Sequence, residues 1–273
     1  MMAGLLRAEW LKLRRMSITW ILLTVPSVLA LLGAILPVNA LADAVRRFGQ
    51  SVLTGLESFA FPQPVLVGLQ LVDFLGSVLV VIFITAVVGN EFGFDTWKNL
   101  LTRRAARGRL LATKLLYALA GAAALVVIVP SVFQLGVVLA FKSALGIDVP
   151  FDSTPGEVQS LAEAALLSWL RLAVCASIGL LAATVTRSSG GGIAISLPWL
   201  LADGMVNGLG LIGGLWQDLA PYTFNFNLGS LASYLDGRTG QVTLAHSLVA
   251  LWIYTVGFVA LAIAVFRRRD IAG

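Results

Sequence analysis

The stretch VVGNEFGFDTWKNLLTRRAARGRLLATKLL, residues 87–116, sets a dense group of charged residues between two long apolar runs, 69–89 and 112–140. Crossing roughly 30 Å of hydrocarbon takes about 20 helical residues, so each flanking run predicts a membrane-spanning helix. Four more runs of this kind lie near residues 18–37, 164–185, 192–213 and 244–266. The sequence therefore predicts six spans.

The composition agrees with this prediction and excludes an ordinary soluble domain. The chain of 273 residues is 58% hydrophobic and only 12% charged, with a mean hydropathy of +0.91. The apolar runs are sustained and do not alternate in short segments, which favours helices over a membrane barrel. We predict an all-α integral membrane protein whose six transmembrane helices form one domain, residues 1–273.

The basic residues indicate how the chain is oriented, because Lys and Arg near span ends are retained in the cytoplasm. One side of the membrane holds Arg7, Lys12, Arg14, Arg15, Lys98, Arg103, Arg104, Arg107, Arg109, Lys114, Arg187, Arg267, Arg268 and Arg269. The other side holds Arg46, Arg47, Lys142 and Arg238. This asymmetry predicts that both termini are cytoplasmic.

The first apolar run also resembles a signal peptide. It is longer than the roughly 7 to 15 apolar residues of a signal peptide, so we expect it to be retained.

Two segments outside the spans have distinctive patterns. Residues 1–16 place Trp10 and three leucines on one helical stripe and most basic residues off it, which predicts a helix lying in the headgroup plane. The alternative is a basic topology signal without ordered structure. Residues 214–232 are too apolar for a solvated loop and too rich in Gly and Pro for a span, so we predict a re-entrant segment in the outer leaflet.

The sequence also indicates a candidate helix cap and three charged residues within the membrane. Ser153 or Thr154 could cap the helix that leads into the fourth span. Asp73 and Arg171 have similar predicted depths near the outer ends of their spans, so an ion pair between them is possible, as is snorkelling to the interface. Asp203 lies deeper, near Asn207, and we expect it to face a polar cavity or another subunit.

The fifth span also carries a spacing of small residues that permits close helix approach. Gly204 and Gly208 are four residues apart, which makes them a candidate packing face for a dimer.

Enzymatic and metal-binding motifs are absent from the sequence. The single His246 has no neighbouring acid or Cys, the single Cys175 lies in a span, and no hydrolase or zinc pattern accompanies them. We predict that the chain is not an enzyme and holds no metal or cofactor.

The charged stretch between the second and third spans could simply be an anchor for anionic lipid, worth about 1 kcal/mol for each basic residue. That interpretation leaves Glu91, Asp95 and Trp97 unexplained, since acids at the membrane surface oppose attraction to anionic lipid. A second pattern is present in this stretch. In order, it contains Glu91, Phe92, Asp95, Thr96, Leu100, Leu101, Arg104, Arg107 and Lys114.

This order resembles the membrane subunit of ABC transporters of the ABC-2 export type, whose members carry Glu, an aromatic residue, Gly and Thr, a Leu pair, Pro, Arg and Lys here. Asp95 stands where Gly is usual, and Arg104 stands where Pro is usual. The resemblance also includes the EWLKLRR segment at 9–15 and the FRRRDI ending at 266–271.

The resemblance implies a function and a set of partners. Residues 91–110 would be a cytoplasmic coupling helix that docks on a separate ATPase subunit, present in two copies that hold ATP and Mg. A second permease subunit, identical or homologous, would complete a dimer in a prokaryotic cell membrane, in contact with lipid and not with nucleic acid. The docking residues would be Glu91, Asp95, Thr96, Trp97, Lys98, Asn99, Leu100, Arg103, Arg104 and Arg107.

The sequence also carries no GxxxxGK[ST] phosphate loop, so ATP hydrolysis is expected on the partner. Two other classes stay open. One is a secondary transporter or channel that works alone through Asp73, Arg171 and Asp203. The other is a membrane anchor or sensor that moves no solute.

Overall fold

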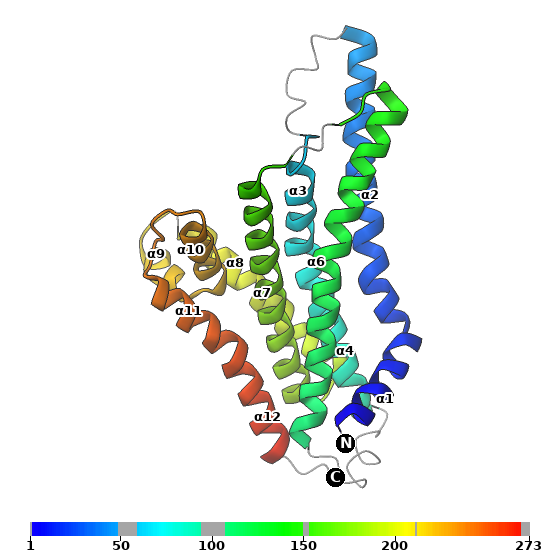
Figure 1. Ribbon diagram of the computed structural model, residues 1–273. Coiled ribbons are helices and arrows are strands. Elements are labelled where there is room, and N and C mark those ends of the chain that lie inside the picture. The colour runs from blue at the N-terminus through cyan, green and yellow to red at the C-terminus, as the bar shows by residue number, and fades with distance from the viewer. Residues whose placement is uncertain (1, 49–58, 94–106, 150–152, 211, 269–273) are drawn as a thin grey trace.

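The computed structural model describes residues 2–48, 59–93, 107–149, 153–210 and 212–268, and within these ranges the chain is helical without strands (Figure 1). Among the described residues, six helices are long and apolar enough to cross a membrane, as predicted. They are Ser17–Phe48, Gln63–Phe92, Gly108–Leu145, Pro155–Thr186, Ser189–Leu209 and Leu244–Arg268. A shorter amphipathic helix, α1 (Met2–Arg15), precedes them.

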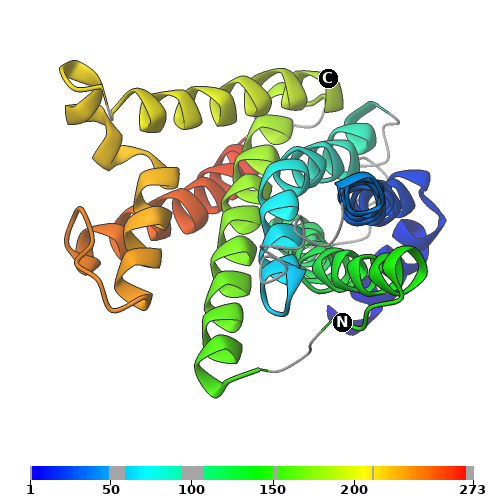
Figure 2. The same ribbon diagram turned by 90° about the horizontal axis from the view of Figure 1, so that it is seen from above.

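The helices form two groups on either side of α7 (Pro155–Thr186), as the view from above shows (Figure 2). On one side, α2 (Ser17–Phe48) packs along α6 (Arg107–Leu145), and α4 (Ser77–Gly93) packs on α7. On the other side, α7 contacts α8 (Ser189–Leu209) and the last helix, α12 (Phe258–Arg268). The main apolar core lies in the first group, and its fully buried side chains include Val72, Ile84, Leu111, Leu125, Leu172 and Leu180.

Two helices run well past the predicted spans. At 1.5 Å per residue, the 32 residues of α2 and the 39 residues of α6 give lengths of roughly 48 and 58 Å, more than the hydrocarbon core requires. Both project beyond α3 (Gln63–Leu71) and α7 at one end of the molecule (Figure 1). Hydropathy locates only the apolar part of a helix, whereas helix-forming residues such as those at 39–48 continue it into the polar region.

The second and sixth spans each contain one turn of π-helix, which the sequence did not predict. Val72–Gly76 (η3) joins α3 to α4, and Ile253–Gly257 (η5) joins α11 (Leu244–Trp252) to α12. A π-turn holds one extra residue and shifts the side chains that follow, and such turns are frequent at functional sites. Asp73 lies in the first of them.

The fourth span begins earlier than the predicted residue 164, and its start confirms one of the two predicted caps. Thr154 and Glu157 form a reciprocal capping box: the Thr154 amide donates to Glu157 Oε2 at 2.7 Å, and the Glu157 amide donates to Thr154 Oγ1 at 3.4 Å. Pro155 takes the first helical position, where a missing N–H costs nothing. The helix therefore starts at Pro155.

The segment between the fifth and sixth spans is more helical than expected. The fifth span ends at Leu209, and Gly213 and Gly214 turn the chain with φ values of 96° and 68°, which favour glycine. Three short helices follow: α9 (Leu215–Leu219), η4 (Ala220–Tyr222) and α10 (Phe224–Leu235). They lie beside the bundle, level with the upper half of α7 (Figure 1).

Candidate functional site: two charge networks and a polar cavity

The first charge network, which we call the ion cluster, consists of Glu9, Lys12, Glu91 and Lys114. Lys114 has no exposed side-chain surface, and its Nζ lies 2.7 Å from Glu91 Oε1 and 3.5 Å from Glu9 Oε1. Lys12 also pairs with Glu91 Oε1. Glu91 and Glu9 expose only 3% and 8% of their side chains. One buried and one exposed lysine thus neutralise two buried glutamates.

The ion cluster joins three helices that are far apart in the sequence. Glu9 and Lys12 come from α1, Glu91 from the last turn of α4, and Lys114 from the second turn of α6. Separating one member would leave an uncompensated buried charge, which typically costs about 3–5 kcal/mol. The second carboxylate oxygens of Glu9 and Glu91 accept no hydrogen bond within the described residues. The cluster therefore fixes α1 against both helices that flank residues 94–106.

One predicted docking residue, Glu91, lies inside the ion cluster. Glu91 was predicted to face a partner subunit, but its carboxylate points into the bundle and is occupied by two lysines. Arg107 is the first residue of α6. The other predicted docking residues lie outside the described residues: Asp95, Thr96, Trp97, Lys98, Asn99, Leu100, Arg103 and Arg104.

The second charge network links four elements around the predicted pair of intramembrane charges. Arg171 Nε lies 3.6 Å from Asp73 Oδ1, so the predicted ion pair is present, between η3 and α7. The pair is about one-third exposed and lines a cavity of about 290 Å³. Arg171 Nη1 also donates to Asn225 Oδ1 at the start of α10.

Asn225 connects Arg171 to Asp203 through hydrogen bonds. The Asn225 side chain donates to Asp203 Oδ2 at 2.6 Å, and the backbone amides of Phe224 and Asn225 donate to the same carboxylate at 2.9 and 3.2 Å. A carboxylate that accepts the first amides of a helix satisfies donors that have no partner in the helix and complements its dipole. Asp203 on α8 therefore holds the N-terminus of α10 in place.

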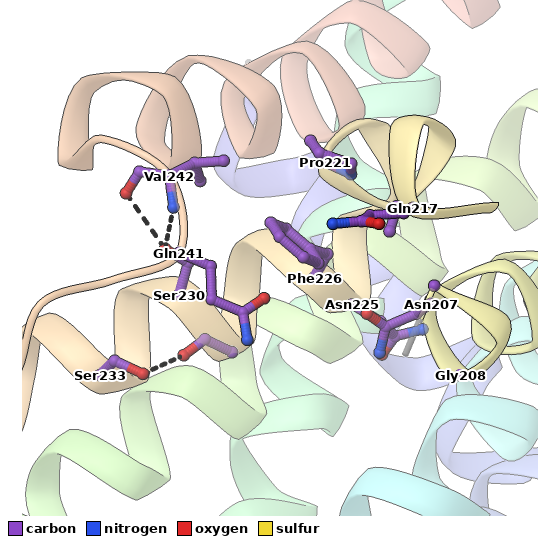
Figure 3. Close-up of a pocket in the computed structure, with 13 residues that line it drawn as sticks. Asn207, Gly208, Gln217, Pro221, Asn225, Phe226, Ser230, Ser233, Gln241 and Val242 are labelled. Atoms are coloured by element: carbon purple, nitrogen blue, oxygen red, sulfur yellow. Dashed lines mark hydrogen bonds between the residues drawn. The ribbon is translucent and has the colours of Figure 1, made fainter. Parts of the chain in front are cut away.

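A polar cavity of about 720 Å³ opens next to this network (Figure 3). Asn207, Gln217 and Asn225 lie on one side of it, and Ser230, Ser233 and Gln241 lie on the other. None of its lining residues is charged. Amide and hydroxyl groups both donate and accept hydrogen bonds, so the cavity suits water or a neutral polar solute. Asp203, which was predicted to face a polar cavity or another subunit, does not line this cavity, whereas its predicted neighbour Asn207 does. Asn225 was missed because one amide in an apolar segment gives no distinctive signal.

Comparison with known proteins shows which family this chain belongs to. A family model described as Protein of unknown function (DUF2705) matches residues 65–272. The chain belongs to this family. No curated protein matches it. Within the DUF2705 match lie the whole second charge network, the polar cavity, and Glu91 and Lys114 of the ion cluster, whereas Glu9 and Lys12 precede the match.

The two glycines predicted as a dimer face have open surroundings in this DUF2705 chain. A Cβ atom added to Gly204 or Gly208 would meet nothing within 4 Å. By contrast, a Cβ at Gly89 would lie 2.2 Å from the Ser189 backbone nitrogen, so that glycine allows α4 to touch the start of α8. Gly204 and Gly208 therefore make no close helix contact within the described chain, and their contact with a second subunit stays a prediction.

The described part of this DUF2705 chain offers no cluster of metal ligands. No group of three or more His, Cys, Asp or Glu side chains gathers at one place within the described ranges. His246 is 3.0 Å from the Pro221 carbonyl oxygen through Nε2, which ties the start of α11 to η4.

Proposed function

We propose that the chain is the membrane-spanning permease subunit of an ATP-driven ABC transporter, most simply an exporter, that forms its pathway as a dimer with two separate ATPase subunits. The observation that carries this proposal is the ion cluster, which joins α1, α4 and α6 around the ends of the connection 94–106. In the ABC-2 permeases that this sequence resembles, the same connection is the coupling segment. A force-bearing connection needs stiff attachment to the bundle, and buried ion pairs on both sides of it supply that attachment.

The ion cluster suggests how movement would reach the membrane. A displacement of residues 91–110 by a closing ATPase pair would act on the last turn of α4 and the first turns of α6 together, because Glu91 and Lys114 hold those turns in contact. Glu9 and Lys12 would add α1 to the same moving unit. In this mechanism Glu91 acts inside the permease as a positioning residue and does not touch the ATPase.

The proposal includes a membrane topology with both termini in the cytoplasm. The start of α6, the end of α12 and α1 lie at the same end of the molecule, as this topology requires (Figure 1). There α1 would lie in the headgroup plane, with Trp10 half-exposed. The helices α9, η4 and α10 would dip into the outer leaflet, which agrees with their position part-way along α7 and with exposed apolar side chains such as Leu215 and Tyr222.

The cavities support solute movement over a role as anchor or sensor. The 290 Å³ cavity beside Asp73 and Arg171 and the 720 Å³ polar cavity share Gly229 in their linings. Polar and ionisable groups at membrane depth are costly and usually mark a pathway or a paired structural site. We therefore assign this region to the outer part of the solute pathway.

The test is capture of the ATPase from native membranes. The tagged chain should retain a soluble protein with a phosphate loop, identified by mass spectrometry. A variant with Thr96, Lys98, Asn99 and Arg103 changed to Ala should lose it. A control with Arg46 and Arg47 changed to Ala, on the predicted outer side, should keep it. Undiminished capture by the first variant would refute docking through this connection.

The second candidate is a secondary transporter that works alone, and one observation favours it. The second charge network runs from Asp73 through Arg171 and Asn225 to Asp203 and could respond to a bound ion. Purified chain in liposomes separates the candidates: solute flux driven by a proton gradient without nucleotide would favour this function. Flux that requires the ATPase and ATP would favour the ABC permease, and absence of both flux and ATPase would leave an anchor or sensor.

A further inference from the structure

An apolar groove with a single cation at its edge lies where α1 meets the first span. Its volume is about 380 Å³, within the usual range for small-ligand sites. Residues from α1, α2, α4 and α6 line it: Trp10, Leu13, Arg14, Thr19, Trp20, Leu22, Leu23, Phe83, Tyr117, Ala120, Gly121 and Ala124. Arg14 is the one charged side chain among these lining residues.

Small residues of α6 and large aromatic rings together line the groove. Ala120, Gly121 and Ala124 repeat along one face of α6 and leave space that larger side chains would fill. Trp10 stacks on Tyr117 with ring centroids 6.2 Å apart and an angle of 21°, and this pair forms a wall. Trp10 and Trp20 expose about half of their surfaces, so the groove opens outward between them.

The polar atoms within the groove are already used by the corner between α1 and α2. Thr19 Oγ1 donates to the Leu13 carbonyl at 2.7 Å, and Trp20 Nε1 donates to the Arg14 carbonyl at 3.1 Å. These bonds satisfy carbonyls at the end of α1 and leave few donors for a ligand. The Arg14 guanidinium is exposed and forms no ion pair with an acid in the described part of the chain. A matching ligand therefore has a long apolar part and one anionic group.

We propose that this groove binds one anionic phospholipid, with an acyl chain against Ala120, Gly121 and Ala124 and the phosphate at Arg14. The positive charge at the edge of the groove favours an anionic headgroup. The helix α1 carries four basic residues and one acid, and Glu9 and Lys12 are already paired in the ion cluster. Three of the six candidate spans contribute lining residues, so a bilayer around those spans would bring lipid to the groove. The site does not depend on an ATPase partner, so its failure would leave the proposed function untouched.

Native mass spectrometry of the detergent-purified chain tests this site. The chain is incubated with phosphatidylglycerol or with phosphatidylcholine of the same acyl chains, and retained lipid is counted. We expect one tightly retained phosphatidylglycerol. Arg14→Gln should lower its retention about tenfold, as expected for loss of a hydrogen bond to a charged group. Arg15→Gln removes the same charge from the same helix outside the groove and should retain lipid like the wild type.

A second pair of variants tests the apolar part and does not depend on Arg14. Ala120→Phe would fill the groove from an exposed position and should abolish retention. Ala123→Phe places the same ring at an exposed position of α6 outside the groove and should have no effect. Equal loss in Arg14→Gln and Arg15→Gln, equal retention of both lipids, or undiminished retention in Ala120→Phe would each overturn the proposal.

Discussion

Lys114 places a full positive charge where its side chain has no exposed surface, with Glu91 at 2.7 Å and Glu9 at 3.5 Å. A compact ammonium suits this position because its three N–H groups can point at separate acceptors, and the third acceptor is the Val87 carbonyl at 3.4 Å. A buried ion pair is not in itself a large source of stability. Removing one partner is nevertheless expensive, because the remaining charge stays buried.

Lys114→Met is therefore expected to destabilise the protein by about 3–5 kcal/mol, because it leaves two buried carboxylates facing each other with Lys12 alone. Thermal unfolding in detergent measures this change. The matched control is Lys142→Met, since Lys142 also pairs with an acid at 3.3 Å but both side chains are more than two-thirds exposed. It should cost no more than about 1 kcal/mol. Similar losses in both variants would show that the ion cluster has no special stability role.

At the scale of elements, α10 depends on a residue of another helix for its start. Thr223 caps it locally by accepting from the Phe226 amide at 3.3 Å, and Asp203 on α8 accepts from the two preceding amides. The first four amides of a helix have no partner within the helix, and these two side chains accept from three of them. The position of α10 beside the polar cavity is thus set by α8 as well as by its own sequence.

Asp203→Ala should loosen the first turn of α10, since the Phe224 and Asn225 amides lose their acceptor. Loss of a cap costs about 1–2 kcal/mol. The local readout is hydrogen exchange at residues 224–227, which should become faster while exchange in α4 and α6 stays unchanged. Asp218→Ala removes an exposed acid from α9 and serves as the control. Unchanged exchange in Asp203→Ala would mean that Thr223 alone holds the turn.

For the molecule as a whole, hydropathy predicted the six long helices because bilayer thickness sets their apolar length. It missed the extensions of α2 and α6 and the π-turns at Asp73 and in the sixth span, since none of these changes the apolar pattern. The Asp73–Arg171 pair, which similar predicted depths had made possible, is present. The ion cluster was not predictable from the sequence. Glu and Lys usually lie at the surface, and only tertiary packing buries Glu9 and Lys114.

The distribution of burial across the molecule also indicates which helices face outward. The apolar window of the second span is 61% buried, but those of the fifth and sixth spans are only 17% and 11% buried. In a bilayer this surface can face lipid or a second copy of the chain, and packing between membrane helices favours small residues at the contact. Gly204 and Gly208 supply such residues on the fifth span.

Gly204→Leu and Gly208→Leu are therefore expected to weaken the proposed dimer and leave the single chain stable, because an added Cβ atom meets nothing within 4 Å in the protomer. Light scattering in detergent should show a shift from dimer to monomer, with an unfolding temperature within a few degrees of the wild type. Ala202→Leu adds the same bulk at another exposed position of α8, on a different face, and should leave the dimer intact. If all three variants stay dimeric, the two chains must meet elsewhere, and the exposed surface of the sixth span becomes the candidate, since it is the least buried of the six.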